Sequence, residues 1–216
     1  MPRMSSADRR LELVQAALRV IAAEGVSAAT TRAIVAEAGM SLASFHYAFT
    51  SRDEMMRELI AFVVENETAA VFTTIRFDTG VRDALRAGLQ GYFDNVVADP
   101  GHEQVMFELM QYALRTPSLE GLAREQYSRY RAAVVELLEA AQQHAGIEWL
   151  LPLDDIARLI VTFTDGITLA WLADRDDAAA GRVMDFAADH LAHLARQNPA
   201  QQNPAPDPST AQGVST

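Results

Sequence analysis

The sequence predicts an all-α fold of about nine helices, in which a small three-helix head precedes a larger helical bundle. Apolar residues recur at helical spacing, as at Leu11, Val14, Leu18 and Ile21, whereas the alternation expected of strands is nearly absent. Capping residues, glycines and prolines divide the helical segments. Half of the residues are hydrophobic and 22% are charged, a balance typical of a globular chain.

The first two helices of the head are predicted from the residues typical of helix starts and helix ends. Ser5 and Asp8 resemble a capping box, and Gly25 ends the helix that follows, because glycine readily adopts the left-handed conformation found there. Thr30 or Thr31 caps a short second helix.

Residues 30–49 match the helix-turn-helix pattern. Gly39 provides the positive φ that the turn needs, and Ser41 caps the next helix. Phe45 and Phe49, four residues apart, are expected to face the core, which leaves the opposite edge of this short helix exposed. The side chains on that edge have the size and polarity to touch thymine methyls, base edges and phosphates in a major groove. This segment is therefore predicted to bind DNA.

The predicted DNA contacts lie on this helix and at two neighbouring helix starts. Thr31 and Arg32 begin the second helix, where exposed N–H groups favour a phosphate, and Arg52 in the first turn of the fourth helix is placed to clamp the DNA backbone. The full set is Thr31, Arg32, Ser41, Leu42, Ala43, Ser44, His46, Tyr47 and Arg52.

The remaining helices are predicted from similar signals. A capping box of Ser51 and Glu54 begins a fourth helix that is expected to continue to about Ile75. Asp99, Thr116 and Asp154 are candidate caps of later helices. Those helices are predicted at residues 81–98, from Pro100, at about 117–145, at 155–174 and at about 177–196, with an apolar connector at 147–153.

Three parts are expected: a helix-turn-helix domain at residues 1–50, an all-helical ligand-binding and dimerisation domain at 51–196, and a disordered tail at 197–216. The tail contains four prolines and no regular apolar spacing.

Charge is distributed unevenly between these parts. The formal net charge is −11, but residues 1–60 hold seven arginines and seven acids, so the excess of acid lies beyond them. An acidic body repels DNA and leaves the amino-terminal face to dock. The chain has no cysteine, no secretion signal at its start and no evident apolar run of about 18 residues, which indicates a soluble cytoplasmic protein without a membrane partner.

The chain resembles the tetracycline-repressor-like (TetR) family of bacterial transcription regulators. The resemblance is carried by AALRVIAAEG at 16–25, TTRAIVAEAGMS at 30–41, SFHYAF at 44–49 and SRDEMMRELI at 51–60, and more weakly by TDGITLAWLAD at 164–174. It implies a DNA-binding head that the fourth helix joins to a ligand-binding and dimerisation body. It also implies that Thr31, Tyr47 and Arg52 hold phosphates, and that Arg32 reaches a base or a phosphate.

The recognition helix departs from the family pattern in two places. Leu42 stands where many members have lysine or arginine, and the order His46-Tyr47-Ala48 differs from the usual one. The helix therefore has no arginine to read guanine, so specificity is expected to depend on methyl contacts, His46 and Arg32.

Aromatic and methionine side chains in the bundle predict a cavity for a small, mostly apolar effector, although each residue separately fits core packing better. Gln111, Arg115 and His102 are candidates to orient a polar end of that ligand. The predicted pocket residues are Phe62, Tyr92, Phe93, Met106, Phe107, Met110, Tyr127, Tyr130, Phe163 and Trp171.

The last two helices carry apolar stripes beside small residues, which favour a four-helix interface between two copies. Packing within one chain is the alternative, but paired reading heads suit twofold operators. The predicted dimer residues are Ile156, Leu159, Ile160, Phe163, Ile167, Val183, Phe186, Leu191 and Leu194.

Other functions have less support. His190 and His193 share a helix face with Asp189 nearby, but two ligands do not make a metal site, and no cofactor loop or catalytic constellation occurs. The sequence thus predicts a ligand-responsive regulator, most simply a dimeric repressor of a palindromic operator. An activator, a ligand carrier whose head has lost DNA binding and a small all-α enzyme are the alternatives.

Overall fold

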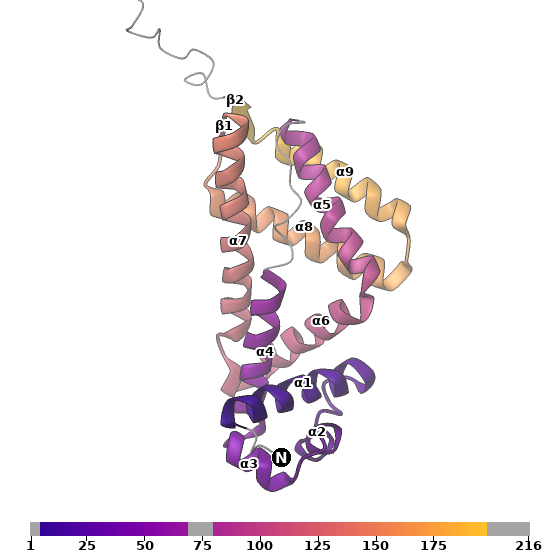
Figure 1. Cartoon of the computed structure of the whole chain (residues 1–216). Coiled ribbons are helices and arrows are strands. Elements are labelled where there is room, and N and C mark those ends of the chain that lie inside the picture. Colours follow the sequence, from indigo (N-terminus) through magenta and orange to yellow (C-terminus); the bar gives the residue numbers. More distant parts are fainter. Residues whose placement is uncertain (1–4, 69–79, 198–216) are drawn as a thin grey trace, which may run out of the picture.

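The computed structural model describes residues 5–68 and 80–197, and these residues form nine α-helices and one two-stranded sheet (Figure 1). The predicted all-α class is therefore confirmed. Figure 1 shows α1, α2 and α3 gathered at one end, α4 leading away from them, and the remaining helices forming the body.

The head consists of α1 (Ser6–Glu24), α2 (Thr31–Glu37) and α3 (Leu42–Ala48). Each begins at an expected cap, because the side chains of Ser5, Thr30 and Ser41 accept hydrogen bonds from backbone N–H groups three residues later. Gly39 has a φ of 62° in the turn between α2 and α3, a conformation that a side chain with a Cβ rarely adopts.

Helix α4 (Arg52–Thr68) connects the head to the body, and its predicted extension to Ile75 lies outside the described residues. The backbone N–H of Glu54 donates to Ser51 Oγ, while the Glu54 carboxylate accepts from the N–H of Thr50. The predicted capping box is present, with the return bond displaced by one residue.

The body contains five further helices. Helix α6 begins at the predicted cap Asp99, whose carboxylate accepts from His102 N. Thr116 does not cap a helix through its side chain, since its hydroxyl donates to Tyr112 O instead. The five are α5 (Val81–Ala98), α6 (Pro100–Arg115), α7 (Leu122–Ala145), α8 (Leu153–Asp174) and α9 (Asp177–Ala192).

Three predicted boundaries in the body were wrong. The helix expected from Pro117 is a 3₁₀ turn at Pro117–Leu119, after which Gly121, at a φ of 92°, precedes α7. The expected connector contains a strand, β1 (Ile147–Trp149), which pairs antiparallel with β2 (Ala195–Gln197), so α9 ends earlier than predicted. Asp154 lies inside α8 and pairs with Arg131 rather than capping the helix.

Two apolar cores stabilise the fold. The first joins α1–α4 to α6 and includes Phe45 and Phe49, and the second lies among α5, α7, α8 and α9. Helix α8 is the one described helix that is long and apolar enough to cross a membrane, a property that the sequence prediction overlooked. One side of α8 packs in the second core, and 33% of its most apolar window is buried.

Candidate DNA-binding edge and body cavity

Helix α3 presents a continuous exposed edge. Leu42 is 43% exposed and Tyr47 is 68% exposed, and Ala43 and His46 are also on the surface. On the opposite side Phe45 is only 1% exposed and contacts the rest of the head core. Leu42, Ala43, His46 and Tyr47 are called the α3 edge below, and their placement is the one expected of a groove-reading surface.

The two serines at the start of α3 already make hydrogen bonds within the protein. Ser41 Oγ accepts from Ser44 N at 3.1 Å, and the two hydroxyls lie 3.0 Å apart. A residue that the sequence reasoning missed lies beside the α3 edge: the Arg9 guanidinium is 5.1 Å from the centre of the Tyr47 ring. This arginine adds positive charge next to a surface that has no arginine of its own.

The two residues at the start of α2 differ in exposure. Arg32 is exposed and Thr31 is half-buried, and both follow the Thr30 cap. Their backbone N–H groups lie at the positive end of the short helix, which suits contact with a phosphate.

Arg52 has a different place from the one predicted for it. Its Nε donates to Ala29 O at 2.7 Å, and its two terminal nitrogens donate to Val26 O at 3.0 Å and to the Tyr112 hydroxyl at 2.5 Å. The guanidinium thus joins the loop between α1 and α2 to α6 of the body. In this structure the Arg52 guanidinium makes hydrogen bonds within the protein, and the predicted phosphate contact would have to be made in addition to them.

A second arginine fixes the orientation of α3. Arg10 on α1 bonds to Glu54 and Glu58 on α4 and donates to the carbonyl of Ala48 at the end of α3. Its guanidinium also lies 4.2 Å from the centre of the Phe49 ring. The hydrogen bond with Glu58 is the main cause that raises the pKa of Arg10, so this tie stays charged.

The body contains a cavity of about 500 Å³ lined by α5, α6, α7 and α8, with Trp149 and Leu191 also in the lining. That volume lies in the range of small-molecule sites. The lining is mostly apolar, with tyrosines and a few acids and amides among the aliphatic side chains.

Six of the ten predicted pocket residues line this cavity: Tyr92, Met106, Phe107, Met110, Tyr127 and Tyr130. His102 lines it as well, whereas Gln111 and Arg115 do not belong to the lining. The other four pack elsewhere: Phe62 against the head core, and Phe93, Phe163 and Trp171 in the body core.

The sequence reasoning missed two polar residues of the cavity, Asp165 and Gln126. Asp165 accepts a hydrogen bond of 2.5 Å from the Tyr127 hydroxyl, and Gln126, only 4% exposed, donates to the Tyr130 hydroxyl at 2.7 Å. Burial raises the pKa of Asp165 above its ordinary value, and burial together with this carboxylate raises the pKa of Tyr127. The signal was present in the sequence, since Asp165 interrupts the otherwise apolar middle of α8.

Helix α6 contacts both the cavity and the head. Met106, Phe107 and Met110 line the cavity, while Glu108 accepts a 2.8 Å hydrogen bond from the N–H of Val26 in the loop after α1. Figure 1 shows α6 lying between α1 and the upper helices of the body. Helix α6 therefore contacts both the cavity and the loop that precedes α2.

The predicted dimer residues divide into two groups. Leu159, Val183 and Phe186 are exposed, at 41%, 42% and 53%, and Ile160, Phe163 and Leu194 are half-buried. Ile156, Ile167 and Leu191 are buried within the protomer, where they pack in the body core. Leu169, 58% exposed, extends the surface formed by the first group. His190 on α9 and His193, which follows its last residue, each bond through Nδ1 to a backbone carbonyl of α9.

Comparison with known proteins agrees with both halves of the architecture. Residues 13–59 match the family described as bacterial regulatory proteins, tetR family, and residues 81–196 match the carboxyl-terminal domain of BetI-type transcriptional repressors. The HTH-type nicotine-responsive transcriptional repressor HdnoR of Paenarthrobacter nicotinovorans is 31% identical over 175 residues, which cover 81% of this chain and 89% of that protein.

Solved structures show the same fold. A transcriptional regulator from Rhodococcus sp. Rha1 superposes with a TM-score of 0.69 at 20% identity, over 86% of this chain and 97% of that one. The multidrug binding protein EbrR complexed with ethidium superposes with a TM-score of 0.63 at 25% identity, over 86% of this chain and 98% of that one. The chain belongs to the TetR family of bacterial transcription regulators.

Proposed function

We propose that this protein is a homodimeric repressor that binds a twofold-symmetric operator and releases it when a small molecule occupies the body cavity. The observation that carries the proposal is the α3 edge, where exposed groove-sized side chains lie over the buried rings of Phe45 and Phe49. The presence of a cavity of about 500 Å³ in the same chain supports control by a ligand. Binding to the bacterial chromosome places the protein in the cytoplasm.

The relatives support both parts of this proposal. HdnoR is a nicotine-responsive repressor, and EbrR is a multidrug binding protein that was crystallised with ethidium. The carboxyl-terminal family is that of BetI-type repressors, which favours repression over activation.

The proposal is tested by selecting bound fragments from genomic DNA. We expect enrichment of an inverted repeat whose half-site centres lie one helical turn, about 34–36 Å, or a multiple of it apart. Affinity for that DNA should fall steeply with salt, because phosphate contacts release counterions. Enrichment of no sequence, with weak binding that is insensitive to salt, would instead favour a ligand carrier.

The reading residues give a more specific prediction. Replacement of either Arg32 or His46 with alanine should weaken operator binding by at least about 1 kcal/mol, because each removes a contact with a base or phosphate. Gel shifts at fixed salt measure this effect. Arg196 is exposed on β2, at the end of the molecule opposite α3 (Figure 1), and Arg196→Ala serves as the control for loss of one positive charge. If neither head variant differs from this control, the assignment of the reading residues is wrong.

The dimer is proposed to form through the exposed stripe of α8 and α9. On α8 this stripe contains Leu159, Gly166 and Leu169, and on α9 it contains Val183 and Phe186. Large apolar side chains on the surface of two neighbouring helices are the usual mark of an interface.

Gly166 offers a test that leaves the protomer intact. A Cβ added at Gly166 would meet no atom within 4 Å in the protomer, so Gly166→Leu should fold normally and yet obstruct close contact with a second copy. We expect light scattering to show a monomer and operator affinity to fall by tenfold or more, since one head loses its partner (about 1.4 kcal/mol per tenfold). Gly91→Leu on α5 is the matched control, because a Cβ there also meets no atom within 4 Å. A stable Gly166→Leu dimer would place the interface elsewhere.

A further inference from the structure

We propose that the effector is an amphipathic amine whose single positive charge binds at the Asp165 carboxylate, between the tyrosine rings at the polar end of the body cavity. This inference rests on the proposed function, because it names the chemical class of the ligand that the cavity receives.

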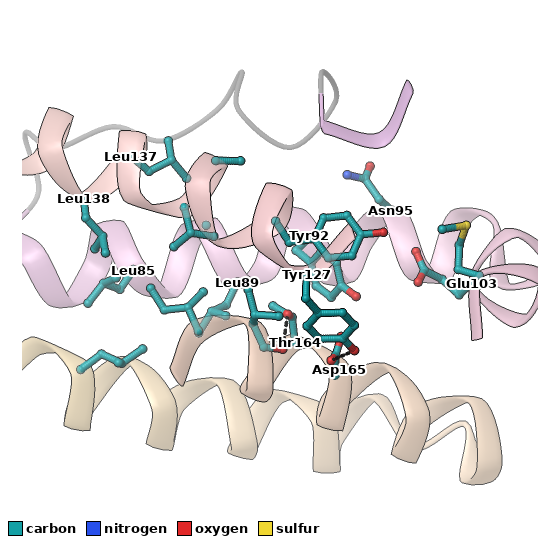
Figure 2. Close-up of a pocket in the computed structure, with 18 of the residues that line it drawn as sticks. Leu85, Leu89, Tyr92, Asn95, Glu103, Tyr127, Leu137, Leu138, Thr164 and Asp165 are labelled. Atoms are coloured by element: carbon teal, nitrogen blue, oxygen red, sulfur yellow. Dashed lines mark hydrogen bonds between the residues drawn. The ribbon is translucent and has the colours of Figure 1, made fainter. Parts of the chain in front are cut away.

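The cavity has two chemically different ends. Figure 2 shows Leu85, Leu89, Leu137 and Leu138 toward one end, and Asn95, Glu103, Tyr127 and Asp165 toward the other. A ligand that fills the whole space must therefore have an apolar body and one polar terminus.

The charges at the polar end select a cation. Asp99, Glu103 and Asp165 all line the cavity together with one histidine, His102, and no arginine is among the described lining residues. Asp99 is already used as the cap of α6, where it accepts from His102 N. An anionic ligand would bring a further negative charge beside the Asp165 carboxylate in a mostly apolar space, whereas that carboxylate attracts a cation.

Asp165 is the best-placed of these acids. It extends from the middle of α8, and among the contacts recorded for the described residues the Tyr127 hydroxyl is its one hydrogen-bond partner. A phenol supplies one hydrogen bond and no positive charge, and a carboxylate accepts about four. Remaining lone pairs can therefore accept from an ammonium without loss of the Tyr127 bond.

The tyrosines around Asp165 are held in position for a cation. The Tyr127 hydroxyl donates to Asp165, the Tyr130 hydroxyl accepts from Gln126, and the Tyr92 hydroxyl lies 2.7 Å from Thr168 Oγ1. The rings of Tyr127 and Tyr130 lie edge to face with their centres 6.0 Å apart. These hydrogen bonds fix the positions of the rings, and the faces of aromatic rings attract ammonium groups.

The test compares three probes that share one ring system and differ in charge: 1-naphthylmethylammonium, 1-naphthalenemethanol and 1-naphthoate. Titration calorimetry uses the full-length protein without DNA. We expect the ammonium to bind about tenfold or more tightly than the alcohol, and the carboxylate to bind most weakly, because one charge-assisted hydrogen bond distinguishes the first two. Tightest binding by the carboxylate, or no saturable binding of the ammonium at millimolar concentration, would overturn the proposal.

Two variants identify the group responsible. Asp165→Asn keeps the shape and an acceptor for Tyr127 but removes the charge, so the ammonium should lose its advantage while the alcohol binds as before. Tyr127→Phe removes the internal hydrogen bond but not the carboxylate, so the preference for the ammonium should persist. If Asp165→Asn retains the preference, or weakens all three probes equally, Asp165 has only a structural role.

The outcome is separable from that of the proposed function. Probe binding is measured without operator, so charge selectivity at Asp165 stands or falls even if the protein never binds DNA. Conversely, operator release by a neutral or anionic compound but by no amine would overturn this inference and leave the ligand-responsive repressor intact.

Discussion

Replacing Phe45 with alanine is expected to destabilise the head by about 3–5 kcal/mol and to abolish operator binding. The side chain is 1% exposed and belongs to the same apolar core as Leu13 of α1, Ile34 of α2 and Met55 of α4. It also contacts Phe49, with ring centres 5.6 Å apart. Helix α3 has only seven residues, too few to persist alone in water, so its shape depends on this packing.

Both tryptophans, Trp149 and Trp171, belong to the body core, which allows the two parts to be followed separately. In urea, the circular dichroism of the helices should begin to decline at a lower concentration in Phe45→Ala than in the wild type. A loss of this size shifts a midpoint by roughly 1 M or more at typical urea slopes. Tryptophan fluorescence should change later, because it reports the body.

The matched control is Leu42→Ala on the exposed side of the same helix. Leu42 is 43% exposed, so its removal should change stability by no more than about 0.5 kcal/mol while still weakening operator binding. An unchanged urea profile for Phe45→Ala would mean that the buried rings do not hold α3 in place, and the basis of the DNA-binding proposal would be lost.

The head could be predicted in detail because its signals are local. The caps at Ser5, Thr30 and Ser41 and the turn at Gly39 each depend on residues within three or four positions, and all four lie where the sequence placed them. The burial of Phe45 followed from its spacing with Phe49 on a short helix. Residues close in the sequence are therefore sufficient to predict these features of the head.

The errors in the body have a common physical origin in contacts between distant residues. Strand β1 exists because Leu150 N and residues 147–149 find partners near residue 195, and no local pattern announces a pairing across nearly fifty residues. Arg52 was predicted to hold a phosphate from its position in a first turn. Its bonds to Val26, Ala29 and Tyr112 depend on how the head sits against α6.

The cavity was predicted in part for a similar reason. Aromatic residues could be found in the sequence, but whether a ring lines the cavity or the core depends on the rotation of its helix. Tyr92 and Phe93 are neighbours, yet Tyr92 lines the cavity while Phe93 packs edge to face on Trp171 in the core. Asp165 was not predicted for the same reason, since the rotation of α8 decides whether its side chain lines the cavity or faces solvent.

Helix α6 is placed to couple ligand binding in the cavity to DNA binding by the head. The family resemblance implies that the fourth helix joins the head to the body, which favours α4 as the coupling element, but the contacts indicate α6 as well. One side of α6 lines the cavity, and from its other side Glu108 bonds to Val26 N and Tyr112 bonds to Arg52. A shift of α6 on ligand binding would therefore move the loop between α1 and α2, and with it the α3 edge.

We expect the double variant Glu108→Met, Tyr112→Phe to bind both operator and ligand but to respond poorly to the ligand. Allosteric coupling is typically 1–3 kcal/mol, a change of about 5–150-fold in operator affinity. The variant removes two of the hydrogen bonds that transmit it and keeps the volume of both side chains. Operator affinity, measured by fluorescence anisotropy with and without an inducing ligand found by screening, should change by less than about threefold.

The control is Glu120→Met, which removes the same charge from an exposed position after the 3₁₀ turn at Pro117–Leu119. It should respond to the ligand as the wild type does. Because coupling requires the ligand to bind the two conformations with different affinity, the double variant should also show equal ligand affinity with and without operator. If it instead retains the full response, α6 does not carry the signal through these two contacts, and α4, the other helix that joins the head to the body, becomes the element whose movement releases the DNA.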